Sequence, residues 1–344
     1  PMAAAKPTVR SIARALKLSR STVSNALRGM PCVKVATRRR VQRAAKAMGY
    51  AVQPFASAVM SQLRRGGQAK ALGTLAVLEM DEPNRPPAAA IFHKRLVEGI
   101  EKRAADMGFT AARWIYGGTE SLALKRLSQI LHWRGIEGLL FLPIWSEPDF
   151  RDLDWTRFTA IYIDYLVRHP ALHTVSTDHF RTMFVALEKA RTLGYRKPGF
   201  AVVLRADARL HGRWTGAYLS YLHYFPEMKL VPPLLVDEIN QASFLPWFRE
   251  YNPDVVITHW LDAPSQMISE GAAIPRTHGY ICLNVLPAPP GFSGFDLQPR
   301  LLGMRAVELV VSQLMHHDRG VPALPSNTLI PARWVDGATM AQRI

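Results

Sequence analysis

From Leu72 onwards, short apolar runs alternate with longer stretches whose apolar residues recur at helical spacing. Apolar strands separated by helices of about 10 to 17 residues are typical of parallel sheets that are covered by helices on both faces. About ten strands are too many for one compact sheet, so the pattern predicts two lobes with a cleft between them. The strand-like runs are residues 72–78, 109–116, 137–144, 159–164, 199–204, 254–260 and 279–283, and the helical stretches are residues 93–107, 119–133, 178–193, 211–223 and 298–315.

The preceding segment, from Thr8 to Arg28, predicts two short helices joined by a tight turn, with Thr8 and Ser19 as N-caps. A third helix is predicted over residues 36–48, and the three helices together can close a small core. Hydrogen-bonding side chains of the kind that read base edges occupy the outward positions of the second helix, namely Arg20, Ser21 and Asn25. The pattern indicates a helix-turn-helix, although a small helical hairpin with a solvated basic face would share its spacing. The apolar positions are Ile12, Ala13, Leu16, Val23, Ala26, Leu27, Val41, Ala44, Ala45 and Met48.

The distribution of charge favours the first of these alternatives. Of the 43 Lys and Arg residues, 15 precede Glu79, which is the first acidic residue of the chain, and the other 28 accompany all 27 Asp and Glu residues. Nearly all of the net charge of +16 therefore lies in less than a quarter of the chain. A solvated surface normally mixes both signs, whereas a segment of one sign is typical of phosphate binding.

Composition limits the class of protein. With 48% hydrophobic and 20% charged residues, and no apolar run near the roughly 18 residues that span a bilayer, a soluble globular protein is expected. Lys6 and Arg10 lead into an amphipathic helix, so no signal peptide is expected and the cytoplasm is the predicted compartment. Cys32 and Cys282 are the only cysteines and lie far apart, which gives no disulfide framework or metal cluster. Since the HExxH, CxxC, Walker and GxGxxG patterns are also absent, no enzyme, metal or cofactor is predicted.

The order of these elements resembles the lactose-repressor/galactose-repressor (LacI/GalR) family, and the resemblance runs nearly end to end. It is specific in the basic N-terminal segment, where the run from Ser19 to Asn25 fits the family's S-x-x-TVS-[RN] pattern. The third helix fits the pattern TR-x-x-V…A…GY through Thr37, Arg38, Val41, Ala44, Gly49 and Tyr50. The remainder matches more loosely, at Gly99-Ile100, Gly108-Phe109, residues 193–196, Gly216 and residues 305–307.

The resemblance implies roles for individual residues of the head. It implies that the second helix reads bases, that a linker helix enters the minor groove, and that a two-fold dimer reads a palindromic operator. Two departures from the family affect details: Lys17 replaces the glycine of the turn, and Val59 replaces the leucine that wedges a base step. The base-reading residues are Arg20, Ser21 and Asn25; the phosphate-binding residues are Thr8, Ser19, Thr22, Ser24 and Arg38; the minor-groove residues are Ala56, Val59 and Met60.

The resemblance also implies a small effector in the cleft. Arg213 matches the family's effector-binding arginine, Asn284 falls where an aspartate usually contacts the ligand, and Asp81 follows the first strand. The usual Asn-Asp pair is replaced by His259-Trp260 or by Trp260-Leu261. An indole face beside carboxylate and amide groups suits a neutral sugar or polyol, which is our hypothesis for the effector. The alternative interpretations place Trp260 in the lobe core and Arg213 in a surface salt bridge.

These observations predict three parts: a helix-turn-helix DNA-binding domain over residues 1–52, a hinge helix and linker over residues 53–71, and a two-lobed α/β domain like the periplasmic binding proteins over residues 72–344. The protein is predicted to be a cytoplasmic, homodimeric transcription regulator that binds double-stranded operator DNA under the control of a sugar. Of the two modes of regulation, repression is the one predicted. Two alternatives stay open: a DNA-binding regulator with a degenerate cleft that answers to a protein partner, and a sugar-acting enzyme fused to a DNA-binding head.

Overall fold

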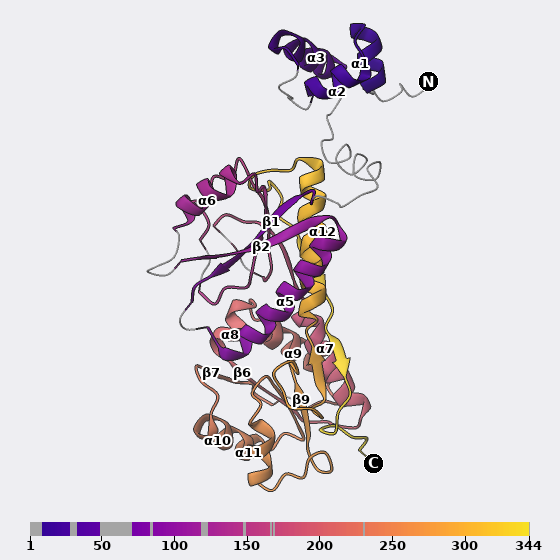
Figure 1. Ribbon diagram of the computed structural model, residues 1–344. Coiled ribbons are helices and arrows are strands. Elements are labelled where there is room, and N and C mark those ends of the chain that lie inside the picture. The colour runs from indigo at the N-terminus through magenta and orange to yellow at the C-terminus, as the bar shows by residue number, and fades with distance from the viewer. Residues whose placement is uncertain are drawn as a thin grey trace, which may run out of the picture. The chain divides into compact units, whose positions relative to one another are not determined.

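The chain forms two compact units, Pro1–Leu72 and Gly73–Ile344, which we call the head and the body. In this computed structural model the structure describes residues 9–27, 33–48, 71–82, 85–117, 123–146, 149–165, 167, 169–229 and 231–343. Figure 1 shows the three helices of the head and the two sheets of the body, each with its helices.

The head is a three-helix unit made of α1 (Val9–Leu16), α2 (Arg20–Leu27) and α3 (Val35–Ala47). Its core is built from most of the predicted apolar positions, with Ile12, Val23 and Val41 fully buried. Met48, predicted to belong to this core, is exposed instead, because it lies beyond the last residue of α3. Lys17, which stands in place of the family's turn glycine, adopts a left-handed φ of 52° in the turn between α1 and α2, a conformation that is uncommon for a residue other than glycine. Ser19 caps α2, because its hydroxyl accepts a hydrogen bond of 3.0 Å from the backbone N–H of Thr22.

The first lobe of the body is a six-stranded sheet in the order β11-β5-β4-β3-β1-β2, and every pair in it is parallel. Two long helices, α5 and α12, pack against each other, and α12 also packs along β3, β4 and β5. The short helix α6 contributes to a separate aromatic core. The elements are β1 (Gly73–Met80), α5 (Pro87–Asp106), β2 (Phe109–Tyr116), α6 (Leu124–Trp133), β3 (Gly138–Phe141), β4 (Thr159–Tyr162), β5 (His173–Thr177), α12 (Pro299–His316) and β11 (Asn327–Ile330).

The second lobe repeats this plan with the order β12-β10-β9-β8-β6-β7, in which only β12 is antiparallel to its neighbour. One core lies between the sheet and the helices α7 and α9, and a second core lies with α10 and α11. The elements are α7 (His179–Thr192), β6 (Pro198–Val203), α8 (Leu204–Arg209), α9 (Arg213–Tyr224), β7 (Leu234–Val236), α10 (Gln241–Tyr251), β8 (Val255–Thr258), α11 (Ala263–Ser269), β9 (Gly279–Cys282), β10 (Gly294–Asp296) and β12 (Arg333–Val335).

The chain crosses between the lobes three times: after β5, between β10 and α12, and between β11 and β12. The crossing segments are hydrogen-bonded to one another. The Thr177 hydroxyl donates to the carbonyl of Leu297 at 3.2 Å, and the side-chain amide of Gln298 donates to the carbonyl of Pro331 at 2.7 Å. The two lobes predicted from the sequence are thus confirmed, and three adjacent segments join them.

We expect the contact between α5 and α12 to depend on glycine. A Cβ at Gly303 would lie 2.3 Å from the Leu96 carbonyl oxygen, and one at Gly99 would lie 2.1 Å from the Arg300 carbonyl oxygen. Gly303→Ala must therefore push the helices apart, and it should lower the free energy of unfolding by about 1–3 kcal/mol. Thermal or urea unfolding of the full chain measures this loss.

Gly216→Ala is the matched control, because Gly216 also lies in a helix but a Cβ added there would have no described atom within 4 Å. Removing a helical glycine there should be neutral or stabilising by up to about 1 kcal/mol. Equal destabilisation by the two substitutions would contradict the assignment of Gly303 to a helix crossing.

Candidate functional site

The exposed side of α2 carries the residues predicted to read bases. Arg20 and Ser21 are exposed and Asn25 is half-buried, whereas Val23 and Ala26 point into the head core. A short chain of hydroxyls lies beside them, since Ser19 Oγ is 2.8 Å from Ser21 Oγ and 2.7 Å from Thr22 Oγ1. These groups can donate to phosphate or base oxygens without a change in the backbone.

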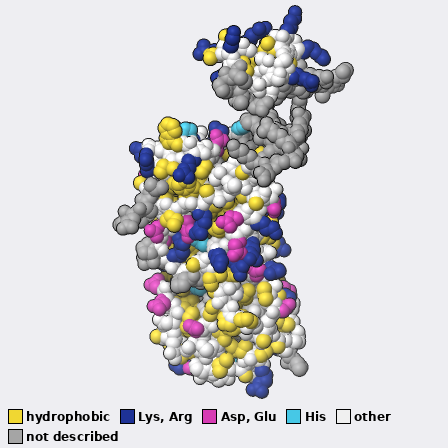
Figure 2. All heavy atoms as spheres, viewed as in Figure 1, with side chains coloured by type: hydrophobic (Ala, Val, Ile, Leu, Met, Phe, Trp, Pro, Cys, Tyr) yellow, Lys and Arg dark blue, Asp and Glu magenta, His cyan; other side chains and the backbone are white. Residues whose placement is uncertain are grey.

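The residues predicted to bind phosphates are only partly within the described chain. Ser19 caps α2, Thr22 lies in its first turn and Ser24 lies near its middle. Arg38 lies on α3, where its guanidinium donates to the Val33 carbonyl at 3.4 Å. In Figure 2 the charged side chains of the head are all Lys or Arg. The predicted residues Thr8, Ala56, Val59 and Met60 lie outside the described residues.

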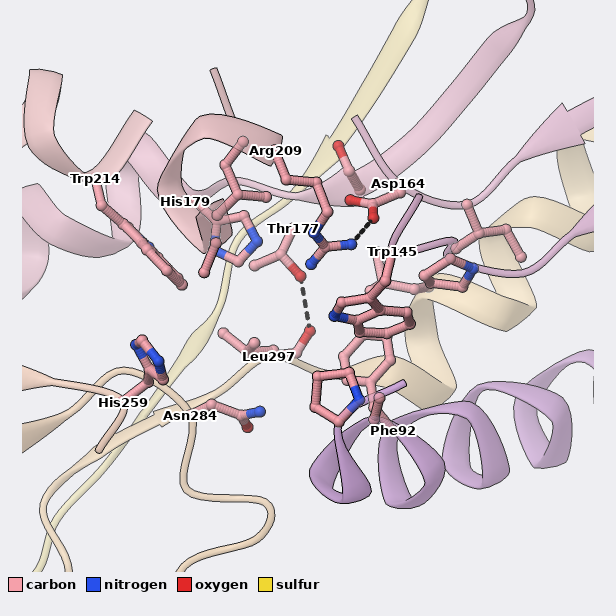
Figure 3. A pocket seen from close by; sticks show the side chains of 18 of the residues that line it. Phe92, Trp145, Asp164, Thr177, His179, Arg209, Trp214, His259, Asn284 and Leu297 are labelled. Carbon is pink, nitrogen blue, oxygen red and sulfur yellow. Dashed lines mark hydrogen bonds and ion pairs between the residues drawn. The ribbon is translucent and has the colours of Figure 1, made fainter. Parts of the chain in front are cut away.

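A second candidate site is a cavity of about 380 Å³ inside the body, with walls from both lobes. Its lining includes residues that follow β3, β4, β6, β8, β9 and β10, so the carboxyl ends of parallel strands surround it. Most of the lining is apolar or aromatic, with a few polar groups among it, which is typical of small-molecule sites. Figure 3 shows Trp214 and His259 on one side of this space and Trp145 on the other.

Three aromatic side chains from the second lobe form one wall of the cavity. The Trp214 ring lies between two imidazoles, with centroids 5.0 Å from His179 and 6.1 Å from His259. Asp207 fixes the start of α9, because its carboxylate accepts from the Trp214 backbone N–H at 3.1 Å and from the Thr215 hydroxyl at 2.5 Å. Trp214 Nε1 and the Nδ1 atoms of both histidines are buried and have no hydrogen-bond partner among the described residues. A bound molecule can supply those partners.

Both histidines of this wall are held neutral at physiological pH. Burial, together with the positive charges of Arg209 and Arg213, lowers the pKa of His179 to about 3. Burial alone lowers the pKa of His259 to about 4. Neutral imidazole both donates and accepts one hydrogen bond, so this wall offers polar edges without positive charge.

On the other side of the cavity, Trp145 is fixed by the first lobe. The Glu82 carboxylate accepts from the backbone N–H of Trp145 at 2.9 Å and from the backbone N–H of Ser146 at 2.8 Å. Arg209, which comes from α8 in the second lobe, lies over the Trp145 ring at 4.8 Å and forms an ion pair with Asp164 of the first lobe. This arginine therefore links the two lobes across the cavity.

Of the four residues predicted to bind an effector, Asn284 lines the cavity and the other three do not. Asp81 is exposed, and the next residue, Glu82, carries the carboxylate that holds Trp145. Trp260 packs on the second-lobe core, 5.3 Å from the Phe244 ring, so its neighbour His259 faces the cavity instead.

Arg213 lies next to the cavity wall without lining it. Its guanidinium is 4.4 Å from the centre of the Tyr165 ring, and its buried Nε has no hydrogen-bond partner among the described residues. The surface salt bridge considered as an alternative for Arg213 is absent from the described part of the chain.

Five further cavity residues are not among those predicted from the sequence to bind an effector. Of these, only His259 could have been found from the sequence, because it stands where the family resemblance places a polar pair that contacts the ligand. The others lie in helices or in loops, where neither periodicity nor a motif marks them. These residues are Trp145, His179, Arg209, Trp214 and His259.

Comparison with known proteins identifies the head. Residues 8–53 match the family model of bacterial regulatory proteins of the lacI family. The head belongs to the lacI family. Comparison with curated protein sequences found no match.

The whole chain has the fold of solved lacI-family regulators. The transcriptional regulator CelR in complex with cellobiose is 18% identical, with a TM-score of 0.57, and the match covers 97% of this chain and 99% of that one. The lac repressor dimer bound to operator and the anti-inducer ONPF is 16% identical, with the same score and coverage. A LacI-family regulator from Enterococcus faecium with bound ribose is 15% identical, with a TM-score of 0.56 over 79% of this chain and all of that one.

The described residues contain no group of three or more His, Cys, Asp or Glu side chains that could hold a metal ion. None of their helices is both long enough and apolar enough to cross a membrane.

The lowered pKa of His179 predicts a loss of stability in acid. The unfolded histidine takes up a proton near pH 6.5, but the folded one does so only near pH 3, so protons favour the unfolded state within this window. The free energy of unfolding should thus fall by about 2 kcal/mol between about pH 7.5 and pH 5 on account of this residue. His179→Gln should remove that part of the pH dependence in urea unfolding.

His132→Gln serves as the control, because His132 is exposed on α6. It should leave the slope of stability against pH as it is in the parent chain. If the slope were unchanged in His179→Gln as well, the neutral buried state of His179 would be wrong.

Proposed function

We propose that the protein is a transcription regulator that binds operator DNA through its lacI-family head and responds to a small molecule in the body cavity. The observation that carries this proposal is the family match over residues 8–53 together with the exposure of Arg20 and Ser21 on α2. The excess of basic residues before Glu79 supports a large phosphate contribution to affinity. Repression, by occlusion of a promoter, is the mode we propose.

The proposed partners follow the solved relatives. The lac repressor structure contains a dimer on its operator, which supports a homodimer on a palindromic site for this chain. The relatives with cellobiose and ribose support a ligand the size of a sugar in the cleft. We place the protein in the cytoplasm, where the DNA is, and we propose no catalytic role. Turnover of a sugar by the purified protein would favour the fused-enzyme alternative instead.

The first test is a selection of random duplexes on the purified full chain at physiological salt, followed by sequencing of the bound molecules. The proposal expects an enriched palindrome, with affinity that falls steeply as salt increases. Binding without any enriched sequence would reduce the head to a nonspecific basic surface and would contradict the regulator function.

Arg20→Ala tests base reading. Loss of a side chain that contacts a base edge should cost about 1–3 kcal/mol on the selected palindrome and relax the preference at one base pair. Arg39→Ala is the control, because Arg39 is an exposed arginine on α3 that we do not assign to base contacts. It should change binding to the palindrome and to random duplexes equally. The same uniform loss in Arg20→Ala would reassign Arg20 to a phosphate.

Arg213→Ala tests the proposed effector site. Because Arg213 lies in the body beside the cavity wall, its loss should abolish release of the palindrome by the effector while duplex binding is retained. Metabolite fractions that release the parent protein in a fluorescence polarisation assay provide the measurement. Loss of duplex binding in the absence of any effector would show instead that Arg213 has a structural role.

A further inference from the structure

The charged groups of the cavity lining are mostly donors. Of the lining residues, only Asp164 has a carboxylate, and each of its oxygens already accepts from the protein: one pairs with Arg209 and the other accepts the Tyr165 backbone N–H at 2.9 Å. Asn284 uses its side-chain oxygen to accept from the Leu286 N–H at 3.1 Å, which leaves its NH₂ group for a ligand. The buried Trp214 Nε1–H is a further donor without a partner among the described residues.

Sugar hydroxyls need acceptors as well as donors. A hydroxyl that is buried without an acceptor loses its hydrogen bond to water, at a cost of about 1–3 kcal/mol. The lining hydroxyls of Ser176 and Thr177 already donate to Asn327 and to the Leu297 carbonyl, so they can still accept. The oxygens of Asp164 and Asn284 also keep a lone pair each, so the lining can accept hydrogen bonds as well as donate them. Among its charged side chains, however, Arg205 and Arg209 outnumber the single carboxylate, which favours a ligand that brings a charged acceptor of its own.

The electrostatic balance at the His179 wall points the same way. Arg205 and Arg209 line the cavity and Arg213 lies directly behind it. Arg205 has no ion-pair partner among the described residues. The charges that act on His179 are those of Arg209 and Arg213, and both disfavour its protonation. Asp164 offsets the charge of Arg209, so the positive potential that remains comes from Arg205 and Arg213, and in a mostly apolar cavity it attracts an anion.

Two nearby acids lie outside the lining and are held at helix termini. The Asp207 carboxylate is buried at the start of α9, where it is bonded to Trp214 N and to the Thr215 hydroxyl. The Asp178 side chain caps α7 by accepting from the Arg181 N–H at 2.9 Å. Both carboxylates therefore cap helix starts, and neither residue lines the cavity.

We propose that the effector is a carboxylate carried on a ring, with the carboxylate at the His179–Trp214 wall near Arg213 and the ring between the aromatic side chains of the two lobes. This inference rests on the proposed effector site and adds a negative charge to the expected ligand. Trp214 on one side and Trp145 on the other can contact a flat ring through their faces. The ring can belong to a sugar acid or to an arene acid, because both present the same anion.

Two matched pairs of probes test the charge and the ring separately: glucuronate with glucose, and 2-naphthoate with 2-naphthamide. Binding to the full chain without DNA is measured by isothermal titration calorimetry, so the outcome does not depend on an operator. At least one acid should bind 10-fold or more tightly than its neutral partner, and the pair that shows this identifies the ring. Neutral members that bind as tightly as their acids, or acids that do not bind at millimolar concentration, would overturn the proposal.

Variants of two charged residues should shift the acid preference in opposite directions. Arg213→Ala should weaken binding of the acid by about 10-fold, because it removes a positive charge directly behind the wall, and should change the neutral partner less than 3-fold. Asp164→Asn frees Arg209 from its counter-charge and should raise the ratio of acid to neutral affinity. Arg181→Ala is the control, because Arg181 is exposed on α7 and does not line the cavity.

These outcomes are distinct from those of the proposed function. If operator selection yields a palindrome but the neutral probes bind best, the proposed regulator function is supported and the proposal of a carboxylate effector is refuted. A lower acid preference in Asp164→Asn, or an equal loss in Arg181→Ala and Arg213→Ala, would also refute the assigned electrostatics.

Discussion

In a parallel sheet, every strand ends at the same edge, so the loops that follow the strands gather there. The body contains two such sheets, and residues beyond the carboxyl ends of strands in both lobes line one cavity. The three crossing segments hold this arrangement, because Thr177 and Gln298 hydrogen-bond them to one another. The site therefore follows from the topology, and the chemistry of the site follows from the few side chains placed at those ends.

Those side chains set a balance between apolar surface and charge. The paired imidazoles stay neutral beside Trp214, and Asp164 neutralises Arg209 within the protein. Burial of a single charge is costly, whereas a charge that is paired across the cavity is tolerated. The cavity thus keeps its walls apolar and retains positive potential near Arg213, which distinguishes it from a site lined by several free carboxylates.

The sequence was sufficient for the features that local chemistry determines. Helical spacing located the head core, the hydroxyl of Ser19 marked a helix start, and the family pattern located the strained turn at Lys17. The alternation of strands and helices predicted two lobes, although short elements such as α8 and β7 were missed, because a few residues carry no reliable periodicity. The Arg209–Asp164 pair spans 45 residues and two lobes, and no local pattern marks it. Likewise, the choice between His259 and Trp260 depends on which side chain the strand end directs at the cavity.

Control of DNA binding by this cavity requires that the ligand distinguish two arrangements of the body, since equal affinity for both would shift nothing. Lining residues from both lobes satisfy that requirement, because moving one lobe changes the ligand's surroundings. Arg209 takes part both in the contact between the lobes and in the electrostatics of the cavity. It pairs with Asp164 across the cavity and lies over Trp145, and it also lines the cavity, where its charge acts on His179. An anionic ligand would compete with Asp164 for this guanidinium, and binding would then alter the contact that joins the lobes. A neutral ligand would leave that ion pair intact and would have to act through packing alone.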